Sequence, residues 1–399
     1  MTEQPIVIVG AGIGGLSAAL CLVQQGFEVQ VVERFDEVRE VGAGILLAPN
    51  ASSVLYGELG LGDQLDAVSA PMERGVIGSW RGKDLVNLPL GSGEFAGPSR
   101  MIHRAALQRV LLDAVGAERV RLGAAVTGYE LTDVGAQALV EGGDSVEGCA
   151  VIGADGLHSM VRAQVVGDGS DPLRYHGYTC WRGITETFEH PEFSRELLTE
   201  VQGRGMRAGM QYVDAERVYW WATADVPEGQ QDDPLTVIDD LKELYGEFPD
   251  HFLAMIDATP ADQILRNDIY DRPPLKRWGE GPVTLLGDAA HPMAPNLGQG
   301  ACSAIEDAQV LALCLAQFEP LEEGLRVYEE LRRPRTAKLQ KLSRQFGTMG
   351  QWSNPVAVKM REWSTALTPQ RVVDGQQREL WGYYPEEVVI EAAARRRSQ

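Results

Sequence analysis

The chain has 399 residues, of which 44% are hydrophobic, and a formal net charge of −21. Its length is enough to bury a large core, either as one elaborate domain or as two domains that share a ligand. Such an acidic body argues against nucleic-acid binding, because phosphate contacts require clustered Lys and Arg.

The cysteine count is odd, and no two cysteines stand in a C-x-x-C pair, so neither a disulfide framework nor a zinc site is predicted. The six histidines show no metal-ligand spacing, and we therefore expect no metal. A reducing, cytoplasmic location fits these observations best. The cysteines are Cys21, Cys149, Cys180, Cys302 and Cys314.

The N-terminus predicts a βαβ unit, with a strand over 6–9, a helix over 14–25 and a second strand over 28–32. Residues 6–23 carry no charge and are nearly long enough to cross a bilayer. Their four glycines and β-branched first residues favour strand, turn and buried helix instead. No integral membrane segment is predicted.

The turn inside this unit reads G-x-G-x-x-G at Gly10, Gly12 and Gly15, directly after the strand and at the head of the helix. Glycines at these positions allow a pyrophosphate to approach backbone N–H groups and the helix dipole. Glu33 ends the next strand and is placed to accept hydrogen bonds from a ribose diol, with Arg34 beside it as a further cofactor candidate. The alternative is a glycine-rich packing turn. The fingerprint alone does not separate NAD from FAD.

Further along, residues 42–61 predict an apolar strand and a helix, for which Asn50 is the expected N-cap. Residues 101–115 predict a strand end that runs into an amphipathic helix. Several short alternating strands follow over 119–152 and end in "CAVIGADG".

After about residue 172 the pattern changes to aromatic, alternating segments typical of antiparallel strands. Two short helices are expected between 234 and 260. From 302 to about 344 the chain is predicted to be helical, with a break near 318–320, and the last fifty residues are helical or irregular.

A second specialised turn lies in "PVTLLGDAAHPMAPNLGQGACSA" at 282–304. A buried strand precedes Gly287 and Asp288, two prolines restrict the loop, and a helix then opens with its free N–H groups directed back toward Asp288. An acid beside a helix N-terminus suits the ribitol and the N1–C2=O region of a flavin. The alternative is an ordinary βα connection in the same sheet.

Three separated motifs now stand in order: the glycine fingerprint, "GADGLHSMVR" around Asp155, and "LLGDAAHPMAPNLGQG" around Asp288. With them the chain resembles, over roughly residues 5–345, the single-component FAD-dependent aromatic monooxygenases of the para-hydroxybenzoate hydroxylase type. The resemblance implies FAD as the cofactor and NADH or NADPH as a transient reductant.

By the same resemblance, Asp288 contacts the ribitol and pyrophosphate region, the backbone from Gly298 to Gly300 meets the isoalloxazine, and Pro295 lines its reacting face. Arg104 would point at the flavin chain and pyrophosphate.

Asp155 is implied in cofactor and nicotinamide handling, with Arg162 as its partner. The alternative for Arg104 and Arg162 is a charge at the surface or at a helix end.

Within that family, the sequences of residues 176–184 and 264–308 are similar to those of FAD-dependent urate hydroxylase and zeaxanthin epoxidase. Arg207 and Tyr219 lie twelve residues apart, as do the arginine and tyrosine with which the urate enzyme holds and activates its substrate. Similar residues recur in relatives with other substrates, so a scaffold role is the alternative.

The chemistry that the resemblance implies begins with reduction of FAD by NAD(P)H. Dioxygen then adds at the flavin C4a carbon, and the hydroperoxide transfers one oxygen atom to an electron-rich carbon. The enzyme is thus expected to hydroxylate or epoxidise a small aromatic, heteroaromatic or olefinic molecule. A flavin oxidase or reductase that acts by hydride transfer without oxygen insertion is the alternative.

Candidates for substrate contact come from the inward side of the aromatic strands: Trp181 or Arg182, then Arg207, Tyr219 and Trp221. For the aromatic residues, core packing is the competing interpretation. His176 is a candidate general base, although a lone histidine beside a glycine is more often structural.

The expected fold is α/β (α+β), with a Rossmann-like FAD-binding domain, an antiparallel β-sheet substrate domain and C-terminal helices. Either a monomer or a homodimer is compatible with the sequence. The predicted boundaries are 1–75, 100–172 and 277–345 for the FAD-binding domain, 76–99 and 173–276 for the substrate domain, and 346–399 for the C-terminal segment.

Overall fold

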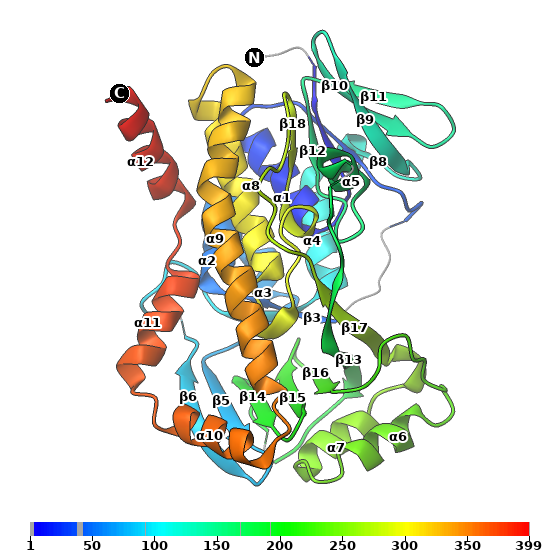
Figure 1. Ribbon diagram of the computed structural model, residues 1–399, viewed down its shortest axis with the longest axis vertical. Helices are drawn as coiled ribbons and strands as arrows, with labels where there is room; N and C mark the ends of the chain where they lie inside the picture. The colour runs from blue at the N-terminus through cyan, green and yellow to red at the C-terminus, as the bar shows by residue number, and fades with distance from the viewer. Residues whose placement is uncertain (1–3, 38–42, 92, 168, 192, 399) are drawn as a thin grey trace.

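A computed structural model of the chain describes residues 4–37, 43–91, 93–167, 169–191 and 193–398. The expected mixed α/β architecture is confirmed, with one parallel sheet, a large mixed sheet and helices at the C-terminal end (Figure 1). Within the described residues, no helix has both the length and the apolar character needed to cross a membrane.

The parallel sheet has the order β18-β12-β1-β2-β8, and every adjacent pair in it is parallel. The central strands β1 and β12 are entirely buried, as expected for uncharged, β-branched runs covered on both faces. The strands are Val283–Leu285 (β18), Ala150–Gly153 (β12), Ile6–Val9 (β1), Val29–Val32 (β2) and Val120–Arg121 (β8).

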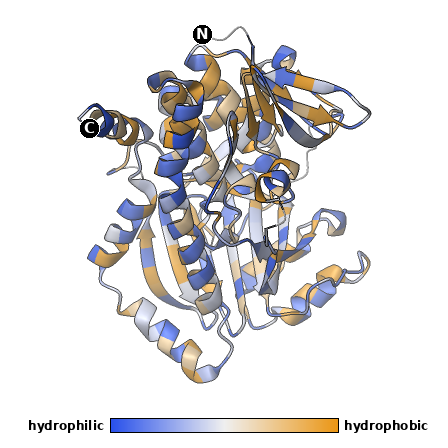
Figure 2. Ribbon diagram, turned by 45° about the horizontal axis from the view of Figure 1, so that its top comes forward, coloured by the Kyte–Doolittle hydropathy of each residue, from blue (hydrophilic) through white to orange (hydrophobic). Residues whose placement is uncertain are grey.

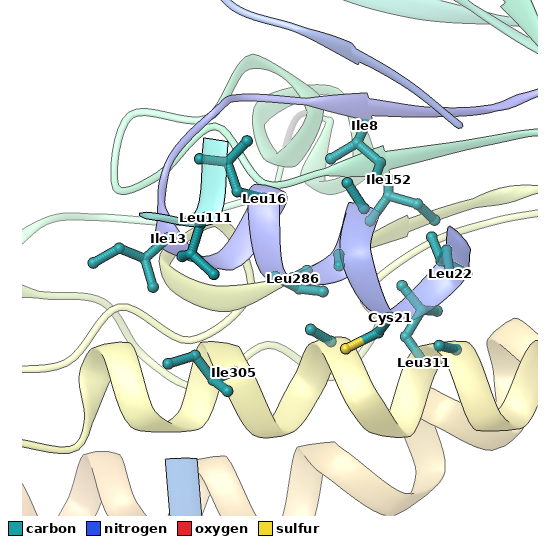
Figure 3. Close-up of a cluster of buried hydrophobic side chains, with 14 of the residues drawn as sticks. Ile8, Ile13, Leu16, Cys21, Leu22, Leu111, Ile152, Leu286, Ile305 and Leu311 are labelled. Carbon is teal, nitrogen blue, oxygen red and sulfur yellow. The ribbon is translucent and has the colours of Figure 1, made fainter. Parts of the chain in front are cut away.

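Helices α1 (Ile13–Gln24) and α8 (Gly300–Gln317) pack closely together on one face of this sheet. Figure 3 shows Cys21 and Leu22 of α1 beside Leu311 of α8. A Cβ atom added to Gly14 would come within 2.9 Å of a Leu286 methyl group and 3.2 Å of the Ala304 Cβ. The absent side chain therefore allows α1 to approach the second specialised turn.

The other face of the parallel sheet is covered by an antiparallel meander, β9 (Val126–Thr132), β10 (Gly135–Val140) and β11 (Ser145–Gly148). Helix α5 (Met160–Val166) packs against β9 and β12. The parallel sheet is thus the middle one of three layers, and α/β sheets of this kind bind ligands at the carboxyl ends of their strands.

The large sheet has the order β17-β13-β16-β15-β14-β5-β6. Its adjacent pairs are antiparallel except β14 and β5, which run parallel because β5 enters the sheet from an earlier part of the chain. The strands are Leu265–Asp271 (β17), Arg174–Thr187 (β13), Arg217–Ala224 (β16), Met206–Tyr212 (β15), Leu197–Gln202 (β14), Arg74–Ser79 (β5) and Lys83–Pro89 (β6).

One face of the large sheet packs against the helices α6 (Val237–Leu244) and α7 (Asp250–Asp257) in a separate aromatic core. The opposite face is turned toward the loop before α8 and toward the C-terminal half of α9 (Leu321–Gly350). Figure 1 shows α9 running along most of the length of the molecule, and α9 contacts β18 of the parallel sheet and β13 of the large sheet.

A small sheet, β3 (Gly44–Leu47), β7 (Arg100–His103) and β4 (Ser69–Pro71), is joined to three helical segments and to α4 (Arg104–Val115). The expectation that Asn50 caps a helix is wrong, because the helix begins at Pro49 with Ala48 as its N-cap. Asn50 lies inside that helix and bonds to residues of α8 instead. The helical segments are α2 (Pro49–Ser52), η1 (Ser53–Glu58) and α3 (Gly62–Asp66).

The C-terminal segment forms α10 (Pro355–Ala366), α11 (Gln370–Trp381) and α12 (Pro385–Arg397). In Figure 1 the chain returns along one side of the molecule through these helices. Helix α10 contacts β6, α11 contacts α2, and α12 contacts α8. Single-turn helices complete the fold at Ala117–Arg119 (η2), Ala261–Gln263 (η3), Gly287–Ala289 (η4) and Pro295–Leu297 (η5).

The docking of α12 is predicted to depend on pH through Glu58 and Glu386. A hydrogen bond to Glu386, together with burial, raises the pKa of Glu58 from 4.5 to about 7. A raised pKa in the folded state stabilises docking at low pH, and this contribution is lost as the pH rises through about 7. Amide-exchange protection of α12 should therefore fall between pH 5.5 and 8, and Glu58→Gln should remove most of this slope. The matched control Glu387→Gln should keep it, and equal slopes in all three proteins would refute the assignment.

Candidate functional site

The glycine turn has the geometry of a dinucleotide site. Gly10 has φ +106°, and an added Cβ would lie 2.6 Å from the Ala154 carbonyl oxygen. A Cβ on Gly15 would overlap the carbonyl oxygen of Gly10, whereas one on Gly12 would meet no atom within 4 Å. Two glycines thus permit the tight turn, and Gly12 leaves its outer side open for a ligand. Helix α1 begins there without a capping side chain or an acidic residue, so its first N–H groups are available to a phosphate.

The acid of the second strand lies beside this turn. One carboxylate oxygen of Glu33 accepts the Ala11 N–H at 2.8 Å, and the other accepts the Phe35 N–H at 3.1 Å. Arg34, the neighbouring candidate, is exposed, and its guanidinium lies 4.6 Å from the Phe35 ring centroid. The turn and the acid are therefore brought together, while Arg34 is at the rim.

Asp155 follows β12 and lies next to the glycine turn. Its Oδ2 accepts the Met160 N–H at the start of α5 at 2.7 Å. Its Oδ1 is buried and has no hydrogen-bond partner within the described part of the chain. Burial raises the pKa of this carboxyl group, although hydrogen bonds from Ser159 and from the α5 backbone oppose the rise. A buried acceptor without a partner calls for a donor, which a bound cofactor can supply.

Asp288 stands at the end of β18 on a turn that requires Gly287 at φ +61°. Its side chain is exposed although protein atoms surround it densely, as expected for a residue that lines a cleft. Desolvation raises the pKa of Asp288, and the nearby His291 and Arg104 partly offset the rise. Arg104, exposed at the first position of α4, therefore acts on the same carboxyl group.

The start of α8 lies directly beside Asp288. A Cβ added to Gly300, the first helical residue, would be 3.9 Å from Asp288 Oδ1. The helix has neither a capping side chain nor an acid in its first turn, so its N–H groups stay available for an electron-rich ring. Gly298 has φ +62°, and an added Cβ would come within 2.9 Å of a Leu46 methyl group of β3. Pro295 is exposed at the head of the same loop.

A buried ion network fixes this loop from behind. Asp307 of α8 accepts the Gly287 N–H at 3.0 Å and binds His291 at 2.6 Å and Arg332 of α9 at 2.6 Å. Burial alone would raise the pKa of Asp307, but His291 and Arg332 hold it below its ordinary value. The ionised carboxylate therefore joins the turn, α8 and α9.

Arg162 joins the second and third motifs. Its guanidinium is buried and donates to the carbonyl oxygens of Ala289 and Ala290 at 2.8 and 2.9 Å. It forms an ion pair with Asp171 at 2.6 Å. The expectation that Arg162 partners Asp155 is thus wrong, and so is the alternative of a surface charge. Its Nη1 holds the loop after Asp288 against α5, while its Nε and Nη2 donate to Asp171.

Strand alternation divides the substrate candidates between the two faces of the large sheet. Arg182, Tyr219 and Trp221 share the face toward the loop before α8, because Arg182 pairs across the strands with Trp221. Trp181 lies on the opposite face, where its indole donates to Asp232 at 2.7 Å and packs in the core with α6 and α7. Of the two alternatives at 181 and 182, the structure therefore brings only Arg182 to the site.

Arg207 is held by protein groups on all sides. Its Nε donates to Gln351 at 3.1 Å, its Nη2 donates to Asn296 at 2.6 Å, and its Nη1 lies 3.7 Å from a Glu200 oxygen. Tyr219 is four residues along β16 from the cross-strand partner of Arg207, which is about 13 Å at the usual rise per residue. The two residues share a face, and Trp221 stands between them, so Arg207 and Tyr219 do not form a contacting pair.

His176 is engaged by an acid, and its ring centroid lies 5.9 Å from that of Tyr178. Its Nε2 lies 2.8 Å from an oxygen of Asp271, which also binds Arg174 at 2.8 Å and Arg344 at 3.1 Å. Burial would raise the pKa of Asp271, but the hydrogen bonds from His176 and Arg174 hold it below its ordinary value. This arrangement gives His176 a structural setting, which was the competing interpretation of that residue.

Sequence reasoning missed Asn296, Tyr178 and Gly44, which help to build the junction between the loop and the two sheets. Asn296 of η5 accepts from both Tyr178 (2.9 Å) and Arg207, and donates to the Ser343 carbonyl. A Cβ on Gly44 of β3 would overlap the ring of Tyr219. The only local signal was the position of Asn296 inside the proline and glycine-rich loop, since its partners lie far away in sequence.

A family model described as an FAD binding domain matches residues 3–343, and the chain belongs to this family. The open Gly12 turn, the unpartnered oxygen of Asp155 and the uncapped start of α8 fit the ADP and flavin ends of that cofactor. The curated relatives of the chain include FAD-dependent hydroxylases, monooxygenases and an epoxidase, so the chain is an FAD-dependent monooxygenase that uses NADH or NADPH as reductant, as the sequence predicted.

Similar proteins include aurachin C monooxygenase/isomerase of Stigmatella aurantiaca, which is 36% identical over 96% of this chain and 99% of its own. 2-Heptyl-3-hydroxy-4(1H)-quinolone synthase of Pseudomonas aeruginosa is 32% identical over 91% of this chain and 94% of its own. The crystal structure of Klebsiella pneumoniae HpxO complexed with FAD and uric acid has a TM-score of 0.88 at 30% identity, covering 95% of this chain and 97% of that one.

The two enzymes that the sequence analysis found similar, urate hydroxylase and zeaxanthin epoxidase, are also among the relatives. FAD-dependent urate hydroxylase of Klebsiella pneumoniae is 34% identical over 84% of this chain and 87% of its own. Zeaxanthin epoxidase of Solanum lycopersicum is 34% identical over 86% of this chain and 54% of its own.

Replacing Asp288 with Asn should weaken FAD retention. The amide keeps the size of the side chain but loses the charge that accepts hydrogen bonds from a polyol, a loss of about 1.5–3 kcal/mol and hence roughly tenfold or more in Kd. Fluorescence titration of the flavin-free protein measures the change. Asp250→Asn, at an exposed position of α7, is the matched control. An Asp288→Asn protein that binds FAD as tightly as the parent would contradict the assignment.

Replacing Arg162 with Met should destabilise the fold by roughly 3–5 kcal/mol, because it leaves a carboxylate and two carbonyl groups without their buried cation. Urea unfolding of the FAD-loaded protein measures the free energy. Arg162→Lys keeps the charge without the planar fork and should lie between the two. A loss below about 1 kcal/mol for the Met variant would show that the clamp is dispensable.

Proposed function

We propose that the predicted cofactor residues hold one extended FAD across the carboxyl ends of the parallel strands. The ADP end lies at Gly10–Gly15 with Glu33, and the isoalloxazine lies at the loop and helix start between Pro295 and Gly300. The available N–H groups at both helix starts support this division, as does the cleft position of Asp288. When bound and reduced, FAD supplies activated oxygen from dioxygen, the second substrate.

The domain division predicted from sequence belongs to the same proposal. The FAD-binding part takes 1–75, 100–172 and 277–345, the substrate-binding sheet takes 76–99 and 173–276, and 346–399 form the C-terminal helical part. Separate hydrophobic clusters under the parallel sheet and under α6 and α7 support the first two parts.

We infer that Arg182 determines the class of substrate, and this residue carries the proposal. Arg182 is partly accessible yet densely surrounded by protein, on the sheet face that turns toward the flavin loop. The Cys180 thiol and the Tyr219 side chain raise the pKa of its guanidinium, and no carboxylate of the described residues forms an ion pair with it. A cation in such a setting calls for an anionic or strongly polarised oxygen on the substrate.

The surfaces around Arg182 fit a flat ring. The Trp221 indole fills the space that Gly209 leaves on the adjacent strand, and the Tyr219 ring fills the space at Gly44 of β3. Aromatic walls beside a cation that has no acidic partner among the described residues suit a planar heteroaromatic substrate, which stacks through its ring and directs one oxygen at the guanidinium.

We propose a 4-quinolone-type ring with an apolar substituent as the substrate, hydroxylated at the ring carbon next to the oxygen-bearing carbon. A relative named for a 2-heptyl-3-hydroxy-4(1H)-quinolone product supports this class. It matches a larger share of this chain than the urate hydroxylase does. The complete set of protein partners around Arg207 gives further support, because the urate hypothesis required Arg207 to bind substrate.

The chemistry of this chain's residues follows from the same geometry. Arg182 stabilises the enolate form of the bound ring, which raises the electron density at the carbon that accepts oxygen. Tyr219 is positioned to hold the ring plane, and burial raises its pKa, so it stays a neutral phenol at neutral pH. Arg207 acts as a positioning residue through Asn296.

Location and assembly complete the proposal. Five free and buried cysteines support a reducing, cytoplasmic setting. We retain the monomer and the homodimer as the two candidate states.

A substrate panel tests the proposed class. With excess NADH or NADPH and ¹⁸O-labelled dioxygen, a 2-alkyl-4-quinolone should stimulate reductant oxidation and yield a product with one labelled hydroxyl group. Urate and 3-hydroxybenzoate should give at most weak stimulation without labelled product. Turnover of urate in preference to the quinolone would refute the substrate class, and absence of label from every product would refute oxygen insertion.

The role of Arg182 is tested by Arg182→Gln. Losing the charge should raise KM for the quinolone by roughly tenfold or more, since a charge-assisted hydrogen bond contributes about 1.5–3 kcal/mol. FAD affinity should not change. Arg266→Gln is the matched control, because Arg266 lies on the opposite sheet face, over Trp181 and paired with Asp232. Equal effects of the two substitutions would remove Arg182 from the site.

A further inference from the structure

Helix α10 carries an apolar stripe that is exposed to solvent. Val356, Met360, Trp363 and Leu367 are exposed by 69, 61, 60 and 79%. Their spacing of four, three and four residues places them within about 60° of one another around the helix, at about 100° per residue. Figure 1 places α10 at the lower edge of the molecule, and Figure 2 shows hydrophobic and hydrophilic residues side by side on it.

The opposite side of α10 is firmly attached to the protein. Val358 is buried, and the buried Arg361 donates to the carbonyl oxygens of Gly350 at 2.5 Å and Gly203 at 2.6 Å. Asn354 caps the helix through the Val356 N–H at 2.9 Å. The stripe is therefore the outer face of a docked helix.

A cation-lined hollow follows one flank of this stripe. It is lined by Trp80, Arg81, Arg204, Pro355, Val358, Lys359 and Glu362. The Arg81 and Arg204 guanidinium groups lie 5.1 and 5.5 Å from the Trp80 ring centroid. Glu362, the acid among the lining residues, accepts the Ser79 hydroxyl at 2.9 Å. The Trp80 Nε1 is buried and has no hydrogen-bond partner within the described ranges.

The positive charges around this hollow contrast with the negative net charge of the chain. The net charge is −21, yet Arg81, Arg204 and Lys359 gather beside one apolar stripe that includes a tryptophan. Exposed Trp, Met and Leu with adjacent Lys and Arg are the composition of helices that lie in a membrane interface. Anionic headgroups attract such basic residues over about a Debye length.

We propose that α10 and this hollow dock the protein on the surface of an anionic lipid bilayer. The stripe enters the boundary between headgroups and acyl chains, and the three cations bind headgroup phosphates. A second copy of the chain is a poorer occupant, because a two-fold contact through this face brings the same cations toward one another.

The docking face is close to the substrate sheet. Gly350, whose carbonyl accepts Arg361, packs directly on the Arg207 side chain. One layer of hydrogen bonds thus separates the lipid-facing helix from the end of the sheet that carries Arg207. A ligand with an apolar substituent partitions into bilayers, so docking here would raise its concentration beside the enzyme. This consequence rests on the proposed function, whereas the docking itself does not.

Vesicle cosedimentation of the FAD-loaded protein, without substrate, tests the docking. Vesicles with 30% phosphatidylglycerol in phosphatidylcholine should retain the protein at low salt, and pure phosphatidylcholine vesicles should retain it weakly. Replacing both Met360 and Trp363 with Ser, or both Arg81 and Lys359 with Gln, should each lower the partition coefficient by roughly tenfold or more. Leu235→Ser, at a 90% exposed site before α6, should leave it unchanged.

Several outcomes would overturn the proposal. One is the absence of binding to anionic vesicles, and another is equal loss in the Leu235 control. Light scattering that shows a dimer dissociated by the Met360 and Trp363 substitutions, without vesicle binding, would make the face a protein interface. Saturable binding of inorganic phosphate in the hollow without vesicle binding would make it a site for a free anion. Failure of the quinolone assay with intact vesicle binding would sink only the substrate class.

Discussion

The site depends on a buried carboxylate, Asp307, that lies behind the turn carrying Asp288. It accepts the Gly287 N–H and pairs with His291 and Arg332, all in a region closed to water. Burying these charges is costly unless each is paired, and breaking one pair leaves another charge stranded. The turn therefore has one geometry, in which Asp288 and the start of α8 face the same space.

A second carboxylate extends this constraint to the rest of the fold. Glu306, the neighbour of Asp307 on α8, pairs with Arg332 at 2.7 Å and Arg335 at 2.6 Å, and accepts the Asn50 amide at 2.5 Å. Asn50 in turn holds the side chain of Gln299 at the N-cap of α8. One ion network thus joins α2, α8 and α9 and fixes the helix start at which we place the flavin ring.

The parallel sheet and the large mixed sheet meet at the loop that this network holds. Asn296 in that loop bonds to Tyr178 and Arg207 of the mixed sheet and to the α9 backbone. Arg162 holds the other end of the loop through Ala289 and Ala290. A reacting centre at the junction therefore has its cofactor side and its substrate side positioned by the same short segment. This arrangement explains how one chain with one nucleotide turn can bring a small ring to the flavin.

What the sequence predicted well was local. The G-x-G-x-x-G turn and the "GD" turn are specified by glycines next to short buried strands, so Gly10 and Asp288 could be placed without knowing the fold. Partners distant in sequence could not be predicted. The assignment of Arg162 to Asp155 failed because Arg162 pairs instead with Asp171, which is nine residues away, and with loop carbonyls that are 127 and 128 residues away. The choice between Trp181 and Arg182 needed the sheet register, since period-two alternation gives two faces without saying which is inward.

Burial and polar satisfaction supplied the remaining information. The sequence predicted Arg207 as a substrate contact, and its three protein partners in the structure support our proposal that it positions other groups. The sequence left Trp181 and Arg182 as alternatives for a substrate contact. The lack of an acidic partner for Arg182 within the described residues makes Arg182 the stronger candidate. Neither distinction can be made from residue type, because both are arginines on aromatic strands.

A crystal structure of the FAD-loaded protein tests the central claim most directly. We expect the Asp288 carboxylate within hydrogen-bond distance of the ribitol or pyrophosphate, and the first N–H groups of α8 at the pyrimidine edge of the isoalloxazine. The turn from Gly287 to His291 should keep its bonds to Asp307. A flavin ring bound elsewhere, with Asp288 in contact only with solvent, would contradict the claim that the second turn holds the reacting end of the cofactor.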